Sequence, residues 1–434
     1  MIIRFKFENF RSIREEQELS FVASSLKDFS DSVVPVQGFR HGLLRVASLY
    51  GANASGKTNV LRALHFVARA VRNSHRYWKP DGPIYVDTFL LEEEAQNRPT
   101  SFRLDFLLAD MRYQFGLTIN KTDVLREWVY CYPSGKKQIW YEREGGASRK
   151  TSFGRKLVGE NRRIENMTRR NSLFLSTAAQ NNHEMLTPLF NWFSERMHFV
   201  YGPRTALLQE TTKRCSDVGF RNELLKFLAT ADLGILSMDI KEETFPEKTK
   251  DMWKELMEFV GKRFASTEEE KAVLEKAAPP QSIQRITLRH KARSGEGTSI
   301  PIEDESAGTE AFLSLLGPVL TTLESGGVLC VDELDSSLHP LLALEIVRMF
   351  KDPDSNPKGA QIIFNTHDVN LLDAKLLRRD EIWFTEKDSE GATHLYPLSD
   401  FKPRQHTNLK DGYLQGRYGA VPFVESFLSG RRKV

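Results

Sequence analysis

The chain has 434 residues, of which 40% are hydrophobic and 27% charged, and its formal net charge is +3. These values are ordinary for a globular protein, and so mild a charge does not by itself imply nucleic acid, although local basic patches remain possible. The three cysteines lie far apart without metal-ligand spacing, which indicates a reducing compartment. No apolar stretch has membrane-spanning length and the first residues do not resemble a signal peptide, so we expect a cytoplasmic protein without a membrane partner.

The N-terminal part of the chain has the order strand, glycine-rich loop, helix. Residues 2–8 alternate apolar and charged side chains, and residues 18–22 predict a second strand that could form a hairpin with the first. Residues 43–50 are mostly apolar and lead directly into the glycine-rich loop. Residues 58–73 then carry apolar side chains close to helical spacing, which predicts a helix.

The next segment, residues 84–145, has a different pattern. Turn residues separate four strand-like runs, at 102–108, 113–119, 124–131 and 138–142. We therefore expect an antiparallel block inserted after the first helix.

Residues 144–171 are polar and basic. Eight lysines and arginines occur here: Arg149, Lys150, Arg155, Lys156, Arg162, Arg163, Arg169 and Arg170. Two interpretations are open: a solvated loop and helix face, or an electropositive patch for nucleic acid or a partner. Few aromatic residues are interleaved, so a stacking platform for single strands is not indicated.

Residues 184–275 carry apolar stripes that predict helices, including one stripe at Leu224–Leu228 and another at Trp253–Val260. No sustained heptad repeat occurs, which excludes a long coiled coil. Ala278–Pro280 ends the segment and a strand is expected at 283–289. We therefore predict three parts: an N-terminal lobe at 1–182, a helical lobe at 183–282 and a C-terminal lobe at 283–434.

The run Gly51–Thr58 matches the pattern G-x-x-x-x-G-K-[ST] in full. Its glycines let the backbone N–H groups point inward around phosphate oxygens, and the following helix N-terminus favours negative charge. Lys57 is expected to reach the β- and γ-phosphates of ATP, and the Thr58 hydroxyl to bind Mg²⁺. The nucleotide-binding residues predicted here are Gly51, Asn53, Ala54, Ser55, Gly56, Lys57, Thr58 and Asn59.

A second motif is the apolar run Val328–Val331, which is followed directly by Asp332 and Glu333. In this position Asp332 would hold Mg²⁺ through a water molecule, and Glu333 would orient and polarise the attacking water as general base. The following residues complete the stretch Asp-Glu-Leu-Asp-Ser-Ser-Leu-His-Pro, and Asp335 lies within it.

This stretch resembles the Walker B motif and D-loop of ABC-type ATPases of the SMC, OLD and RecF kind. The resemblance implies an α/β P-loop NTPase of the ABC/SMC-head type, with a mixed sheet, an antiparallel β subdomain and a helical insert without a long coiled coil. It also implies ATP and Mg²⁺ as cofactors, ATP hydrolysis as the activity, and a nucleotide contact for Asp335.

Further segments resemble the remaining parts of these ATPases. Asp304–Thr309 resembles the signature motif through Ser306 and Gly308, although the usual Leu-Ser-Gly-Gly is here Glu-Ser-Ala-Gly. Thr366–Asp368 resembles the switch region, with His367 contacting the γ-phosphate. This resemblance gives Lys57, Glu333 and His367 the catalytic roles.

Two single residues are also assigned by resemblance. Glu8–Ser12 resembles a segment of SMC-like heads that places Arg11 near the nucleotide; the alternative is a solvated turn residue. Gln180 resembles the Q-loop glutamine, which would contact both nucleotide and Mg²⁺ from a strand end that leads into a helical lobe. An ordinary surface glutamine is the alternative there.

The signature motif implies a partner, because in ABC-type ATPases it caps the γ-phosphate bound by a second protomer. We therefore expect a homodimer or higher oligomer with two ATP molecules between its heads. The short helical insert and the short tail argue against SMC and OLD proteins themselves. The tail 413–422 resembles stand-alone ATPases of bacterial anti-phage systems, of the RloA, AbiL, PARIS AriA and Septu PtuA type. Two interpretations of that tail are open: a packed C-terminal turn, or a docking element for the partner nuclease.

This last resemblance implies a sensor or scaffold that regulates a separately encoded nuclease, Toprim-like or HNH, with nucleic acid or a phage protein as the trigger. The alternative is a RecF-like DNA-binding ATPase of repair or recombination. A nucleotide-gated binding protein with little turnover is a third possibility, but the intact Glu333 argues against it.

Overall fold

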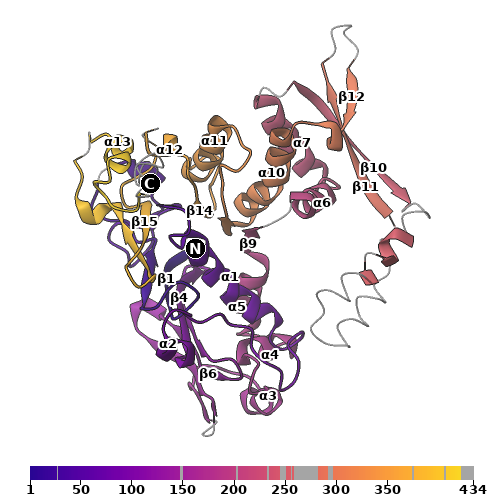
Figure 1. Ribbon diagram of the computed structural model, residues 1–434. Helices are drawn as coiled ribbons and strands as arrows, with labels where there is room; N and C mark the ends of the chain where they lie inside the picture. Colours follow the sequence, from indigo (N-terminus) through magenta and orange to yellow (C-terminus); the bar gives the residue numbers. More distant parts are fainter. Residues whose placement is uncertain are drawn as a thin grey trace, which may run out of the picture. The chain divides into compact units, whose positions relative to one another are not determined.

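The computed structural model describes residues 1–26, 28–146, 150–201, 204–231, 234–244, 251–255, 257–258, 282–291, 297–373, 376–404 and 407–421 (Figure 1). These residues form two compact units. The first unit combines Met1–Gly202 with Pro318–Val434, and the second is Pro203–Gly317. The division of the chain into three parts, with boundaries after residues 182 and 282, stays a prediction. Among the described residues, no helix is long and apolar enough to cross a membrane.

A six-stranded mixed sheet forms the centre of the first unit. Its strand order is β16-β15-β3-β14-β13-β9. All neighbours are parallel except β15 and β16. The inner strands are continuous apolar runs buried on both faces, as parallel sheets require. The bounds are β3 (Val46–Gly51), β9 (Met197–Val200), β13 (Val328–Val331), β14 (Gln361–Asn365), β15 (Ile382–Lys387) and β16 (Thr393–Pro397).

The predicted antiparallel block is confirmed, and it is larger than expected. It forms a seven-stranded sheet in the order β2-β1-β4-β5-β6-β7-β8. The N-terminal hairpin belongs to this sheet, because β1 pairs with β4 along its length. The strands are β1 (Ile2–Glu8), β2 (Gln17–Ser20), β4 (Thr100–Leu108), β5 (Met111–Ile119), β6 (Val124–Cys131), β7 (Gln138–Glu144) and β8 (Lys150–Phe153).

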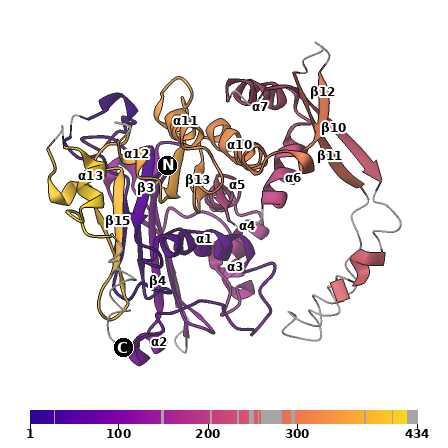
Figure 2. The same cartoon turned by 45° about the horizontal axis from the view of Figure 1, so that its top comes forward.

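Helix α1 (Lys57–Asn73) lies between the two sheets (Figure 2). One side packs against β3 and β14, while the Phe66 ring stacks on Phe102 of β4. The predicted helix is therefore confirmed, and its apolar side chains pack against both sheets rather than one. Two shorter helices, α4 (Phe174–Gln180) and α5 (Thr187–Glu195), pack against α1, and α3 (Asn161–Met167) packs against α4.

The remaining helices of the first unit are short connectors around the central sheet. After Walker B come α11 (Pro340–Lys351), α12 (Asn370–Asp373) and α13 (Leu409–Leu414), and α2 (Glu93–Asn97) lies in the connection to β4. Proline at the start of α11 suits that position, because its missing N–H is not needed there.

The second unit contains helices and a three-stranded antiparallel sheet in the order β10-β11-β12. The predicted strand at 283–289 is confirmed as β11. The prediction that 184–275 is helical throughout is wrong at β9 and β10, which are strands. The Trp253–Val260 stripe lies partly outside the described residues. The elements are α6 (Arg204–Arg214), α7 (Val218–Thr230), β10 (Ile235–Thr244), β11 (Ser282–His290), β12 (Thr298–Pro301) and α10 (Ala307–Ser325), whose C-terminal half belongs to the first unit.

Candidate nucleotide site

The glycine-rich loop joins the end of β3 to the start of α1, as the motif requires. Gly56 has φ = 110°, and a Cβ there would lie 2.3 Å from Thr393 Oγ1. Only glycine therefore fits, for reasons of both conformation and space. The loop is also held from outside, since Thr393 Oγ1 donates to the Ser55 carbonyl at 2.8 Å and Ser55 Oγ lies 2.6 Å from Thr385 Oγ1.

The Lys57 side chain is buried within this loop. Its amino group donates to the carbonyls of Gly51 at 2.7 Å and Ala52 at 3.0 Å. Burial lowers the pKa of Lys57, while the carboxylates of Glu333, Asp335 and Asp332 act in the opposite direction. The ammonium group is thus held at the loop's concave side, where it can exchange carbonyl oxygens for phosphate oxygens.

The first Walker B acid meets the end of the glycine-rich loop. Thr58 Oγ1 donates to Asp332 Oδ1 at 2.8 Å. No group of three His, Cys, Asp or Glu side chains that could hold a metal occurs within the described part of the chain. A hydroxyl and one carboxylate nevertheless fit Mg²⁺, which uses few protein ligands when substrate phosphates complete its shell.

Asn365, the last residue of β14, connects these groups and was missed by sequence reasoning. Its Nδ2 donates to Asp332 Oδ1 and lies 3.4 Å from Thr58 Oγ1, while its Oδ1 accepts from the Glu333 backbone N–H. A single asparagine at a strand end has no motif of its own. The only available signal was its position directly before Thr366 and His367.

The second Walker B acid and the switch histidine line the same cavity as the loop. This cavity, about 580 Å³, is lined by Asn53 to Asn59 together with Arg62, Glu333, Asn365, His367 and Lys387. Glu333 has φ = 57°, so its backbone adopts the left-handed region that non-glycine residues rarely occupy. Asp335 accepts from the His367 backbone N–H at 3.3 Å, which ties the D-loop to the switch residue.

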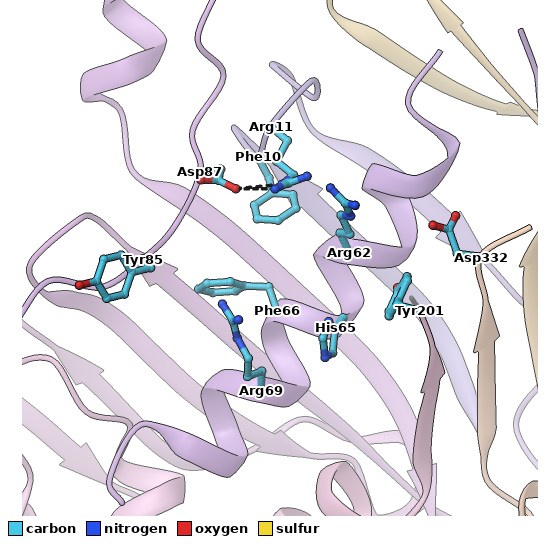
Figure 3. Close-up of a pocket in the computed structure, with 10 residues that line it drawn as sticks. All are labelled: Phe10, Arg11, Arg62, His65, Phe66, Arg69, Tyr85, Asp87, Tyr201 and Asp332. Atoms are coloured by element: carbon cyan, nitrogen blue, oxygen red, sulfur yellow. Dashed lines mark hydrogen bonds and ion pairs between the residues drawn. The ribbon is translucent and has the colours of Figure 1, made fainter. Parts of the chain in front are cut away.

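A second cavity of about 270 Å³ adjoins the first and shares Arg62 with it (Figure 3). Helix α1 contributes Arg62, His65, Phe66 and Arg69, and the rest of the lining is Phe10, Arg11, Tyr85, Asp87, Tyr201 and Asp332. Burial lowers the pKa of His65 to about 4, helped by the neighbouring arginines, so this ring is neutral at pH 7. Aromatic rings and guanidinium groups together dominate the lining.

Arg11 lies in this second cavity, beside the nucleotide loop. Its guanidinium pairs with Asp87 at 2.8 Å and its Nη1 lies 3.4 Å from Asn59 Oδ1. Asn59 in turn donates to Ser12 Oγ at 2.7 Å. The structure therefore brings Arg11 to the start of α1, as the resemblance to SMC-like heads implies.

Gln180 is not brought to the site, and its assignment as the Q-loop residue needs correction. It ends α4, which is anchored at the far end of α1: the His75 N–H donates to Ser176 Oγ and the Leu173 N–H to Ser74 Oγ. The 17 residues of α1 span about 25 Å, so Gln180 lies far from Lys57. The strand that leads into the second unit is β9, and Tyr201, which follows it, lines the cavity beside Asp332.

The signature residues lie in the second unit, at the start of α10. Ser306 is exposed, and its Oγ accepts the Thr309 N–H at 3.1 Å and contacts Thr309 Oγ1 at 2.9 Å. This is the bonding of a helix N-cap. Gly308 lies in the first turn of the helix.

Two further predicted segments have structural roles. Arg169, in the basic segment, donates to the backbone carbonyls of Ser74, His75 and Trp78, and Arg149 lies outside the described residues. In the tail, the rings of Tyr413 and Tyr418 stack against Phe384 of β15, which favours a packed C-terminal turn for residues 413–421. Pro422 lies outside the described residues.

Comparisons with solved structures find low sequence identity. An SMC head bound to the C-terminal winged-helix domain of ScpA is 12% identical, with 93% of this chain and 99% of that chain covered and a TM-score of 0.38. An SMC head with an extended coiled coil bound to the C-terminal domain of ScpA, from Pyrococcus furiosus, is 13% identical, with coverages of 92% and 97% and a TM-score of 0.37. The transporter subunit cbiO1 from Clostridium perfringens is 10% identical, covers 96% of both chains and has a TM-score of 0.31.

Comparison of the sequence with protein-family models identifies the family of this chain. No curated protein matches the chain significantly. One family model, described as "AAA domain, putative AbiEii toxin, Type IV TA system", matches residues 46–373, which is more than half of the chain. The matched range begins at β3 and includes the glycine-rich loop, Walker B and His367. The chain therefore belongs to this family of AAA-domain P-loop ATPases.

Proposed function

We propose that this protein binds and hydrolyses ATP with Mg²⁺. The observation that carries the proposal is the convergence of Thr58, Asp332 and Asn365 beside the buried Lys57. Three different strands end at this point, and the carboxyl edge of such a sheet is where α/β proteins bind ligands. Thr58 and Asp332 would hold Mg²⁺, which would neutralise charge on the phosphates.

The protein's own residues can be given distinct tasks. Lys57 and the loop N–H groups bind and orient the phosphates. Glu333 is placed to accept a proton from the attacking water, because it lines the same cavity and its backbone is fixed by Asn365. His367 lines the same cavity and would contact the γ-phosphate, and Asp335 accepts a hydrogen bond from its backbone N–H.

We place the sugar and base of ATP in the second cavity. It shares Arg62 with the first cavity, and its aromatic rings and arginines suit a nucleoside next to its α-phosphate. Arg11 and Asn59 would then lie beside the nucleoside, where polar groups fix orientation.

We also propose that two copies of the chain enclose the nucleotides. Ser306 and the N-terminus of α10 form an exposed anion-binding arrangement, and in this reading they meet the γ-phosphate held by the other copy. The complete ATPase site would then combine the loop of one protomer with the signature of its partner.

Size-exclusion chromatography with light scattering tests this proposal. Glu333→Gln should hold ATP without turning it over, so ATP and Mg²⁺ should shift this variant from monomer to dimer. Lys57→Ala is the matched control, and it should stay monomeric because it cannot bind the phosphates. A Glu333→Gln protein that binds ATP but remains a monomer would contradict the paired arrangement while leaving the nucleotide site intact.

At the level of the cell, we propose that the ATPase controls a separately encoded nuclease in defence against phage. The family's description as a toxin of type IV toxin–antitoxin systems supports a role in growth arrest or defence. Plaque assays with and without the neighbouring gene test this role. Protection that persists in Lys57→Ala cells would argue against it, and DNA-stimulated ATP hydrolysis would favour the RecF-like alternative.

A further inference from the structure

The signature segment departs from the usual Leu-Ser-Gly-Gly at its first position, where this chain has Glu305. A glutamate directly before Ser306 is unexpected, because its charge would repel the triphosphate that Ser306 approaches in the proposed two-protomer site. Its side chain is only 8% exposed, so solvent screens it poorly. The neighbouring acids Glu303 and Asp304 are exposed, and water screens their charges.

A histidine from another element meets this carboxylate. His290 is the last residue of β11, and its Nε2 contacts a carboxylate oxygen of Glu305. With an ionised carboxylate as its partner, Nε2 is the donor, because a carboxylate only accepts. The pair thus joins the end of the β10-β11-β12 sheet to the residue before Ser306.

The backbone of His290 is paired with strands on both sides. It pairs with Ile235 of β10 on one side and Thr298 of β12 on the other, so it lies at the end of the central strand with a neighbouring strand on each side. The turn that carries Glu305 is also close to this sheet, because the 3₁₀ turn Ile302–Asp304 packs against β11. The histidine therefore offers a fixed anchor for a short segment that leads into α10.

We propose that His290 is a positioning residue for the signature motif. It holds Glu305 against the sheet, which fixes Ser306 at the N-terminus of α10 and keeps the glutamate charge off the surface that receives the γ-phosphate of the other protomer. This inference rests on the proposed two-protomer ATPase site. In the usual signature sequence an apolar residue precedes the serine. Here the His290–Glu305 pair would take its place in positioning Ser306.

His290→Ala should lower ATP hydrolysis at least about tenfold, because small misplacements at a reacting centre are costly. ATP binding to the protomer's own loop should remain, since Lys57 and Thr58 are unchanged. The double variant His290→Ala/Glu305→Leu should recover most of the activity, because removing both members of a buried polar pair leaves no unpaired charge. Glu303→Gln is the matched control in the same turn and should hydrolyse ATP normally.

Mixing variants separates this role from simple misfolding. In a symmetric pair with two composite sites, an equimolar mixture of His290→Ala and Lys57→Ala should regain up to about a quarter of wild-type activity, because a mixed pair keeps one intact site of two, and the ATP bound there can hold the pair together although Lys57→Ala alone stays monomeric. His290→Ala mixed with Ser306→Ala should regain nothing, because both defects lie on the signature side. The mixture of Lys57→Ala with Ser306→Ala is the reference for composite sites.

Three results would overturn the inference. Normal hydrolysis by His290→Ala alone would show that the pair does not position the signature. Rescue of Ser306→Ala, but not of His290→Ala, by Lys57→Ala would place the histidine's effect elsewhere while the composite site stands. Failure of the reference mixture would remove the composite site itself, and the role of His290 with it.

Discussion

Asn365 contacts three groups that have roles in the proposed nucleotide chemistry. Its amide donates to Asp332 and approaches Thr58, and its carbonyl oxygen accepts from the Glu333 N–H. The Asn365 amide therefore fixes the Asp332 carboxylate, which would hold Mg²⁺, relative to the backbone of Glu333, the proposed general base. Glu333 needs this support, because its positive φ is costly for a residue with a side chain.

Asn365→Ala should slow ATP hydrolysis by about 10- to 100-fold, the usual loss when a supporting residue behind a metal ligand is removed. ATP binding should weaken much less, since Lys57 and the loop remain. Single-turnover phosphate release and equilibrium binding of a fluorescent ATP analogue measure the two effects separately. Unchanged hydrolysis would show that Asp332 and Glu333 keep their positions without the amide.

Gln180→Ala should leave ATP hydrolysis within about twofold of wild type, as surface substitutions away from special features generally have small effects. The reason is its place on α4, which is anchored at the C-terminal end of α1. Steady-state phosphate release at several Mg²⁺ concentrations checks this. A raised Mg²⁺ requirement would restore the assignment made from the sequence.

These two residues show what local sequence can and cannot reveal about a site. Lys57, Thr58 and Asp332 were predicted because their motifs are contiguous and each follows a buried strand. Gln180 was misplaced because nothing in its neighbourhood shows at which end of α1 its helix packs. Asn365 was missed because its partners lie 33 and 307 residues away in sequence.

At the scale of elements, the glycine-rich loop is shaped as much by its neighbours as by its own glycines. The β16 strand begins at Thr393, whose side chain occupies the space beside Gly56. The loop cannot relax away, because Thr393 also donates to the Ser55 carbonyl. The wall of the loop is therefore made by a strand that follows it by more than three hundred residues.

Gly56→Ala should reduce the free energy of unfolding by several kcal/mol, since it adds a steric clash to an unfavourable φ. Gly135→Ala is the matched control: its φ of 77° is also left-handed, but nothing lies within 4 Å of the added Cβ. It should cost only about 1 kcal/mol. Urea unfolding of both variants measures the difference, and equal losses would show that Thr393 yields to the added methyl group.

Predictability also differs among elements. Six strands of the seven-stranded sheet were predicted within a few residues, because most of them alternate clearly, whereas β8 was not predicted, since it lies in the polar and basic segment 144–171. β9 has only four residues, Met-His-Phe-Val, between two helices, and so short a run cannot be separated from helix by periodicity. The pairing of β1 with β4 was also not predicted, because it joins segments on either side of the central strand β3.

At the scale of the whole molecule, a buried ion pair joins α11 to the segment that begins β15. The Lys351 amino group donates to Glu381, and both side chains are almost fully buried. Burial raises the pKa of Glu381 and lowers that of Lys351, while each partner acts in the opposite sense on the other. The pair lies away from the nucleotide loop, so its role is structural.

Lys351→Met should destabilise the first unit by about 3–5 kcal/mol, because it leaves the Glu381 carboxylate buried without its partner. The double variant Lys351→Met/Glu381→Gln should lose less, since no charge stays buried. Urea unfolding at pH 7 gives both values, and ATP hydrolysis per folded molecule should not change. A single variant as stable as wild type would mean that water reaches Glu381 once the lysine is gone.

Thr393 contacts the nucleotide loop and Ser12 contacts Asn59 at the start of α1, and both contacts bear on when the chain acquires the proposed activity during synthesis. Ser12 and Thr393 lie outside the matched family range, one before it and one after it. A nascent chain that has emerged from the ribosome as far as His367 already contains every catalytic residue proposed above. It still lacks β15, which pairs with β3, and the strand that walls the loop. Nucleotide binding should therefore be acquired late, when the last strands leave the ribosome, so that an incomplete chain holds the motifs without the activity.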